Sequence, residues 1–463
     1  MSLRRNSSVN LVESVDFLMR NFRMLLLLLV SLSCAWSITA QRLEDVLASS
    51  SKATYTAASL SPGAQKYYLE RRKFIADTRT ELLNRMIAEA VLDLEAKSVS
   101  STSEKLMADQ QNKVREPTPA EVQRFYDTNV ARDGGRPLDE IRPQLIAYLK
   151  EQASEYAADA YLQTLRTKYK VVSGKDVNGL GMSAPDIVAT IGTRTITLGE
   201  FEQKNKIHLN DTSMQIYEEI RADLESSIFS SLASEEAKSR NIDEQAFIAE
   251  EITDKLKLFT DEEKSSIESA LKKRLFTKYA VKVTLPEPAP LVQTISFDAD
   301  DPQTGSASAP VTVVMFTDFQ CPACSRTHPV LKRTLAEYGD KIRFVIRDFP
   351  LERVHENAFQ AALAANAARA QGKFVEYTDV LYRNQDALDK ASLLRYATEL
   401  GLNAKQFELD FNDAKAIAEV RKDQADGRDY GVSGTPTIFV NGVKVQRLSA
   451  EAFRRAVDRA LSK

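Results

Sequence analysis

The segment Cys-Pro-Ala-Cys at residues 321–324 constrains the fold of this 463-residue chain more than any other feature. It directly follows residues 311–317, an apolar and β-branched run that is typical of a buried strand. Residues 325–338, which come next, carry apolar side chains at helical spacing. The first cysteine, Cys321, is therefore predicted at a strand-to-helix turn, where the helix N-terminus favours a thiolate. A thiolate beside a second thiol can attack a disulfide and then be released by internal exchange.

Half of a zinc site and a pair of unreactive core thiols are the two other interpretations of these cysteines. A structural zinc site needs four ligands, usually a second cysteine pair or two suitably spaced histidines. The chain has three histidines, His208, His328 and His355, and no second cysteine pair. We therefore interpret Cys321 and Cys324 as catalytic residues that form a redox-active disulfide, and we expect no other cofactor and no metal.

A second motif, Gly-Thr-Pro-Thr-Ile-Phe-Val-Asn-Gly at residues 434–442, indicates a turn, a short strand and a hairpin. Together with the cysteine motif it resembles the thioredoxin superfamily, and more narrowly the DsbA-like thiol oxidoreductases, over residues 291–463. In that family a helical insertion separates the two halves of the fold, and residues 354–428 are alanine-rich and helix-periodic. The resemblance implies that Pro436 is cis and that the Thr435 backbone binds an extended substrate chain. An ordinary turn proline is the alternative.

The chain departs from this family at positions that tune the cysteines. Many relatives carry a buried glutamate, a proton acceptor, six residues before the first cysteine, where this chain has Met315. Pro322 and Ala323 lack the histidine that stabilises the thiolate in DsbA itself, so we expect a milder oxidant. Asp318 matches the family's run before the first cysteine and is interpreted either as a pKa-tuning acid or as a turn acid.

Two histidines near the cysteine motif are assigned structural roles. His328 lies one helical turn past Cys324, and we predict it on the helix surface rather than as a catalytic base. His355 is predicted to cap the first helix of the insertion or to pack against it.

The N-terminus carries the pattern of an export signal. Arg20 and Arg23 precede an apolar run at residues 24–30, and Ile-Thr-Ala at residues 38–40 offers a small-residue cleavage site. We therefore predict that residues 1–40 are a signal peptide with an N-terminal extension. Export would place the protein in the periplasm or cell envelope, where disulfides persist.

The start residue and the fate of Cys34 are open to alternatives, whereas the sequence does not predict a membrane span or nucleic-acid binding. Met19 or Met24 are alternative starts, and Cys34 allows a lipoprotein anchor, although the leucine usual three residues before such a cysteine is absent. No segment reaches the ~20 apolar residues of a membrane span. The net charge of −3 gives no indication of nucleic-acid binding.

The helical front half is predicted to contain two copies of one unit. Each copy opens with a strand, a turn and a second strand, continues through helices, and closes on a strand-like tail. The alignment of the copies runs without gaps between the first two pairs of matching segments. These segments are Val-Leu-Ala 46–48 and Ile-Val-Ala 187–189, Glu-Ala-Lys-Ser 95–98 and 236–239, and Thr-Lys-Tyr 167–169 and 277–279.

This duplicated pattern resembles the N-terminal chaperone module of SurA-like periplasmic foldases. The run Pro-Thr-Pro-Ala-Glu-Val-Gln-Arg-Phe-Tyr-Asp-Thr-Asn at residues 117–129 is also similar to that group. We find no parvulin core, so the resemblance does not imply prolyl isomerase activity. It implies an apolar groove that holds unfolded chains, and a spacer or dimerisation arm is the alternative.

These observations predict a multidomain protein with a mostly α-helical N-terminal half and a C-terminal α/β thioredoxin fold that contains an inserted helical subdomain. The predicted function is that of an exported thiol–disulfide oxidoreductase, which oxidises cysteine pairs of unfolded envelope proteins while the helical module holds these clients. The alternatives are a disulfide isomerase or reductase, and a holdase chaperone with a secondary redox site. The predicted boundaries are 1–40 for the signal, 41–174 and 175–285 for the two repeats, 286–290 for a proline-rich linker, and 291–463 for the DsbA-like domain.

The predicted partners are unfolded or reduced protein substrates, and no nucleic acid. The family resemblance further implies a membrane redox partner of the DsbB or vitamin K epoxide reductase type, which would reoxidise the cysteine pair.

Overall fold

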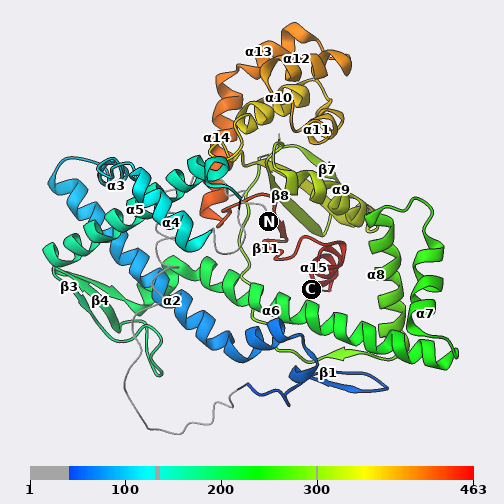
Figure 1. Cartoon of the computed structure of the whole chain (residues 1–463). Helices are drawn as coiled ribbons and strands as arrows, with labels where there is room; N and C mark the ends of the chain where they lie inside the picture. Colours follow the sequence, from blue (N-terminus) through cyan, green and yellow to red (C-terminus); the bar gives the residue numbers. More distant parts are fainter. Residues whose placement is uncertain (1–40, 131–135, 299–300, 463) are drawn as a thin grey trace. The chain divides into compact units, whose positions relative to one another are not determined.

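The structure is a computed structural model that describes residues 41–130, 136–298 and 301–462, so the predicted export signal and Cys34 lie outside the described residues. Most of the described residues are helical, and the strands within these ranges form three small sheets (Figure 1). None of the helices in the described part combines the length and the apolar character needed to cross a membrane. The described chain divides into two compact units, and we describe each separately.

The smaller unit spans residues 73–206. It contains a three-stranded antiparallel sheet in the order β3-β4-β5, together with the end of one long helix and the start of another. Its helix α4 begins with a capping box, in which Thr118 and Glu121 each bind the other's backbone amide. The elements are the end of α2 (Pro62–Ser98), α3 (Ser103–Gln111), α4 (Pro119–Asn129), α5 (Leu138–Lys168), β3 (Val171–Ser173), β4 (Ile187–Ile191), β5 (Arg194–Thr197) and the start of α6 (Leu198–Ser239).

The larger unit combines residues 41–72 with residues 207–462. Its helical part contains the second three-stranded sheet, in the order β2-β1-β6, and the remaining turns of α2 and α6. Residues 284–291, which include the predicted proline-rich linker, form neither helix nor strand. The other elements of this part are β1 (Val46–Ser49), β2 (Thr54–Thr56), α7 (Glu244–Glu251), α8 (Asp261–Lys278) and β6 (Lys282–Val283).

The two copies of the repeat exchange their last strands. Strand β3 closes the first copy in the sequence but pairs with β4 of the second copy, and β6 closes the second copy but pairs with β1 of the first. The two hairpins share the same register, including an irregularity after Val46 in one copy and after Ile187 in the other. Each three-stranded sheet therefore contains residues from both copies, and the compact units do not coincide with the sequence repeats.

Both copies also bury the same acid against the same partners. The carboxylate of Glu95 accepts hydrogen bonds from Lys168 Nζ at 2.5 Å and from the Tyr169 hydroxyl at 2.8 Å. The sequence alignment pairs these residues with three residues of the second copy that make the same contacts. They are Glu236, Lys278 and Tyr279.

A five-stranded sheet in the order β11-β10-β8-β9-β7 forms the centre of residues 291–462. Strands β8 (Val311–Thr317) and β9 (Ile342–Asp348) are parallel and are joined by α9 (Pro322–Ala336), whereas β10 (Thr437–Val440) is antiparallel to β8. This is the thioredoxin arrangement that the sequence predicts. The remaining elements are β7 (Gln303–Gly305), β11 (Val443–Lys444) and α15 (Ala450–Leu461).

Five helices are inserted between β9 and β10, and Figure 1 shows four of them, α10–α13, grouped together. The alanines of α10 are almost all buried, because their small side chains let neighbouring helices approach closely. The five helices are α10 (Ala358–Ala370), α11 (Phe374–Arg383), α12 (Lys390–Glu399), α13 (Ala404–Phe411) and α14 (Ala414–Asp429).

The two faces of the central sheet bury different sets of side chains. Along β8, Val313 and Met315 belong to the core cluster that contains both cysteines, and the alternate residues belong to a second cluster. Because side chains alternate between the faces of a strand, Thr317 lies on the cysteine face. The same alternation along β9 places Asp348 on the cysteine face and Arg347 on the opposite face.

Candidate active site

Cys321 and Cys324 lie where β8 passes into α9. Cys321 is the N-cap residue of the helix, and Pro322 occupies its first turn, a position at which proline leaves no backbone hydrogen bond unmade. Cys321 is 7% exposed, whereas Cys324, one turn into the helix, is completely buried. Both residues are free thiols. A substrate can therefore reach only the first sulfur.

The surroundings of Cys321 stabilise a thiolate. A hydrogen bond from the Cys324 thiol is the largest cause, and together with Thr435 and the backbone amides of Ala323 and Cys324 it lowers the pKa of Cys321 to about 5, against the opposing effect of burial. Thr435 Oγ1 is buried and lacks a hydrogen-bond partner in the described structure, so a thiolate at Cys321 would satisfy it. Cys321 is thus charged at neutral pH.

Cys324 has the opposite character. Burial is the largest cause that raises its pKa well above the ordinary value for a thiol, and the neighbouring Cys321 raises it further. The pair is therefore asymmetric, with an accessible thiolate in front and a protonated, buried thiol behind it. This asymmetry suits one cysteine for attack on a substrate sulfur and the other for internal release.

The loop before β10 lies directly against the first sulfur. The Thr435–Pro436 peptide bond is cis, as the family resemblance implies. When Cys321 is protonated, its thiol donates a hydrogen bond to the Thr435 carbonyl oxygen at 3.3 Å. The structure therefore brings together four of the predicted site residues, Cys321, Cys324, Thr435 and Pro436.

Asp318 is buried beneath this turn and has two roles. One carboxylate oxygen accepts a hydrogen bond from the Gln320 backbone amide, as expected of a turn acid. The other lies 2.8 Å from His355 Nδ1 and accepts a hydrogen bond from the Leu351 amide. The hydrogen bond between His355 and Asp318 is the largest cause that raises the pKa of His355, and the charge of Cys321 raises this pKa further.

The prediction that His355 caps the first helix of the insertion is therefore wrong for its side chain, and the alternative that it packs against this helix stays a prediction. The His355 side chain contacts Asp318 rather than capping the insertion, and Asn357 is the N-cap residue of α10. A protonated His355 also interacts favourably with the Cys321 thiolate, because opposite charges close together stabilise the charged form of each group. The sequence gives little indication of this contact, since it joins residues 37 positions apart.

The prediction for His328 is also wrong, because this residue is buried rather than on the helix surface. Its ring lies 5.1 Å from the ring of Tyr382, and burial lowers its pKa to about 4. It is therefore neutral at physiological pH. A pattern that could have revealed its burial was present, because His328 continues the stripe formed by Cys324, Leu331 and Leu335 on α9.

An open groove of about 550 Å³ lies between α9 and α11, starting one turn beyond Cys321. Its apolar wall includes Pro329 and Tyr382. Three cationic side chains line it, and none of them forms an ion pair with another described residue. They are Lys332, Arg333 and Arg383.

Comparisons with known proteins assign the C-terminal region. Residues 298–459 match the protein family described as Thioredoxin, and this region is a thioredoxin-like domain. The predicted fold class is therefore confirmed. The match leaves the helical half unassigned, so its resemblance to SurA-like foldases stays a prediction.

Individual relatives are similar over a limited part of the chain. The Na(+)/H(+) antiporter NhaA 1 of Mycolicibacterium gilvum is 39% identical over 160 residues, which are 34% of this chain and 26% of the antiporter. A thioredoxin-like oxidoreductase from Silicibacter pomeroyi is 30% identical, with a TM-score of 0.34, over 36% of this chain and 95% of that structure. Oxidised BdbD from Bacillus subtilis is 19% identical, with a TM-score of 0.33, over 38% of this chain and the whole of that structure. The chain spans about a quarter of the length of the curated relatives it matches.

Proposed function

We propose that this protein is an exported thiol–disulfide oxidoreductase that oxidises cysteine pairs in unfolded envelope proteins. The observation that carries the proposal is the asymmetry of the cysteine pair, in which an accessible thiolate at Cys321 stands in front of a fully buried, protonated Cys324. The position of the Thr435 backbone beside the Cys321 sulfur supports it, because this backbone offers an edge to an extended client chain.

The proposed reaction starts from the Cys321–Cys324 disulfide. A client thiolate attacks Cys321 Sγ, so that a client–Cys321 disulfide forms and the bond to Cys324 breaks, leaving the electron pair on Cys324. The second client thiolate then attacks the client sulfur of this mixed disulfide, and Cys321 leaves as a thiolate. The client has been oxidised by two electrons and the pair reduced. A low pKa at Cys321 speeds the second step, since it makes this sulfur a good leaving group.

The helical half, the location and the redox partner complete the proposal. We place the protein in the periplasm or cell envelope, with the helical half as a holder of unfolded clients and a membrane protein of the DsbB or vitamin K epoxide reductase type as the oxidant that restores the disulfide. Mass spectrometry of the envelope fraction should show loss of residues 1–40. An intact N-terminus in the cytosol would contradict the location, and a diacylglyceryl group on Cys34 would favour a lipoprotein.

The chemistry is tested with the oxidised mature protein and a short peptide that contains two reduced cysteines. We expect rapid formation of the peptide disulfide with wild type and none with Cys321→Ser. The reduction potential of the pair, measured against glutathione, then separates the alternatives. A value towards about −120 mV favours an oxidase, and a value towards about −270 mV favours a reductase.

The role of the helical half is tested by comparing the mature protein with residues 291–463 alone. Both should oxidise the short peptide at the same rate, and the mature protein should be faster on a reduced, unfolded polypeptide, because a held client has a higher effective concentration near Cys321. Equal rates on both substrates would leave the helical half as a spacer or dimerisation arm. Full suppression of aggregation by a variant without either cysteine would favour the holdase alternative.

A further inference from the structure

A buried carboxylic acid lies on the same face of the sheet as the cysteines, and nothing described so far uses it. Asp348 is the last residue of β9 and is 6% exposed. It is the register partner of Thr317, the last residue of the parallel strand β8. Neighbouring strands lie about 5 Å apart and directly paired residues project to the same side, so the side chains of Asp348 and Thr317 are adjacent on the cysteine face, although no hydrogen bond joins them in the described structure.

Thr317 connects this acid to the buried cysteine. Its hydroxyl is in hydrogen-bonding contact with the Cys324 sulfur and lies 2.7 Å from the Tyr382 hydroxyl. Both hydroxyls are buried, and each can accept one proton while it passes on another. The fully buried Met315, two residues earlier on the same face, offers no proton to Cys324.

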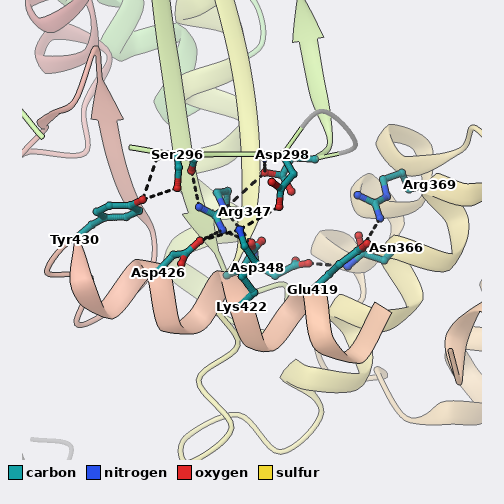
Figure 2. A network of polar contacts seen from close by, with 12 residues as sticks. Ser296, Asp298, Arg347, Asp348, Asn366, Arg369, Glu419, Lys422, Asp426 and Tyr430 are labelled. Carbon is teal, nitrogen blue, oxygen red and sulfur yellow. Dashed lines mark hydrogen bonds and ion pairs between the residues drawn. The ribbon is translucent and has the colours of Figure 1, made fainter. Parts of the chain in front are cut away.

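Asp348 itself has no counter-charge in direct contact among the described residues. The Asn366 amide donates a hydrogen bond to its Oδ2 at 2.7 Å (Figure 2). Burial is the largest cause that raises the pKa of Asp348 to about 8, the negative charge of Asp423 on α14 adds to it, and Arg369 on α10 opposes it. Tyr382 on α11 has a pKa raised well above its ordinary value by burial. Asp348 and Tyr382 are therefore both protonated at neutral pH.

We propose that Asp348 is the proton donor and acceptor for Cys324, acting through the hydroxyl of Thr317, which Tyr382 orients. The proposal rests on the thiol–disulfide exchange proposed above. Strand β8 of this chain has Met315, which cannot exchange a proton, at the position where many relatives carry a buried glutamate. The proposal assigns the proton exchange to Asp348 on the neighbouring strand β9 instead.

The proton balance follows from the exchange reaction. When a thiolate attacks Cys321, the S–S bond breaks and Cys324 leaves as a thiolate in a site that strongly disfavours its charge. A proton then passes to Cys324 Sγ through the Thr317 hydroxyl, and Asp348 is left as a carboxylate that solvent later reprotonates. In the reverse direction, Cys324 must lose its proton before it attacks the mixed disulfide, and the Asp348 carboxylate receives it.

The test is the rate at which dithiothreitol reduces the Cys321–Cys324 disulfide of the mature protein, measured from pH 5.5 to pH 9.5. Asp348→Asn keeps the size of the side chain and its acceptor for Asn366. We expect this variant to be about 10- to 100-fold slower than wild type at pH 6–7. The ratio of the two rates cancels the ionisation of dithiothreitol, and it should approach one above the pKa of Asp348, where wild type has also lost the proton.

Three further variants separate proton transfer from structural damage. Tyr382→Phe removes the hydrogen-bond partner that orients the Thr317 hydroxyl and should slow reduction in the same pH range, and combining it with Asp348→Asn should give no further loss, since both act on proton transfer through Thr317. Asp340→Asn, which removes an exposed acid in the turn before β9, should leave the rate unchanged. Alkylation of reduced Cys321 by iodoacetamide should be equally fast in all variants, because it requires no proton transfer to or from Cys324.

The outcomes distinguish this proposal from the function on which it rests. If wild type is reduced normally and Asp348→Asn and Tyr382→Phe match it at every pH, the proton path is wrong while the exchange stands. A variant that is slower by the same factor at every pH would also contradict it, since only a titrating group produces the expected convergence. A wild-type pair that forms no reducible disulfide would overturn both proposals.

Discussion

Arg347 and Asp348 are consecutive residues of β9, and their side chains point to opposite faces of the same sheet. Arg347 is completely buried, donates hydrogen bonds to Asp423 and Asp426, and also donates one to the Ser296 carbonyl oxygen at 2.6 Å (Figure 2). Asp348 is buried with an amide as its hydrogen-bond partner. On the Arg347 face, a buried positive charge is thus compensated by carboxylates. On the cysteine face, the buried Asp348 carries no charge because it stays protonated.

This difference separates stability from chemistry. A charge enclosed by partners is fixed in place, and removing one partner leaves the other buried without compensation. A neutral acid without a counter-ion can give up and regain a proton. We therefore expect substitutions on the Arg347 face to change the free energy of unfolding, and substitutions on the cysteine face to change the reactivity of the thiols. The predictions below test this division, from the largest expected effect to the smallest.

The largest effect is an all-or-none change on the cysteine face. Cys324→Ser should trap clients as mixed disulfides on Cys321, because the internal thiol that releases them is gone. Cys321→Ser should trap none. Non-reducing gels of envelope extracts, followed by reduction, would measure the difference. Trapping through Cys324 alone would reverse the assignment that rests on their unequal exposure.

The second effect compares two aspartates, one on each face. Asp423→Asn removes the carboxylate that accepts a hydrogen bond from Arg347 Nε at 2.9 Å. This substitution should lower the free energy of unfolding by roughly 3–5 kcal/mol, because it leaves a buried charge without compensation. Urea denaturation followed by far-UV circular dichroism would measure it. The pKa of Cys321 should not change, because this network is on the opposite face.

Asp348→Asn is the matched control, and its effect on stability should depend on pH. The pKa of Asp348 is raised from 3.8 to about 8 on folding, so the folded state holds a proton that the unfolded state has lost between these values. The free energy of unfolding of wild type, relative to the variant, should therefore fall as pH rises from about 4 to about 8. If Asp348→Asn lowered the free energy of unfolding at pH 8 as much as Asp423→Asn does, the two faces of the sheet would not differ in the way described above.

Much of the catalytic region was predictable because its signals are local. The strand, the turn with Cys321 and the helix after it are consecutive, and the proline loop before β10 carries its own motif. The stripe of buried residues on α9 indicates that His328 is buried, but the sequence does not show what covers it, because Tyr382 belongs to α11 of the insertion. The sequence does not show that Arg347 is buried with compensation, because its carboxylates come from α14, 76 and 79 positions away.

The helical half illustrates the same limit. The duplication was visible in matching segments, and the equivalent contacts of Glu95 and Glu236 support it. The exchange of β3 and β6 between the copies was not visible, because both tails carry similar strand-like sequences and either hairpin could accept either tail. Sequence similarity between the copies is what conceals their pairing.

A third prediction concerns the two histidines on the cysteine face. His355→Gln should raise the pKa of Cys321 by on the order of one unit, because it removes a positive charge that favours the thiolate. His355 has a raised pKa and is protonated near pH 5, where Cys321 titrates, so its charge is present in the relevant range. Thiolate absorbance at 240 nm against pH would measure the shift.

His328→Gln is the control for this prediction. Burial keeps the pKa of His328 at about 4, so this residue is already neutral where Cys321 titrates. The substitution should leave the pKa of Cys321 unchanged, even if it lowers stability. Equal shifts in both variants would show that packing around the sulfur, rather than the charge of His355, sets its pKa.

The smallest effect is expected at the exposed edge of the Arg347 network. Lys422 Nζ lies 3.0 Å from Asp298 and 3.1 Å from Asp426, but about half of its side chain is exposed (Figure 2). Water and salt screen such pairs, so Lys422→Gln should cost less than about 1 kcal/mol of unfolding free energy, and nothing at high salt. Asp423→Asn should keep its cost under the same conditions. Both substitutions remove one charge from the same network, so equal losses would show that the number of ion pairs, and not burial, governs the stability of this face.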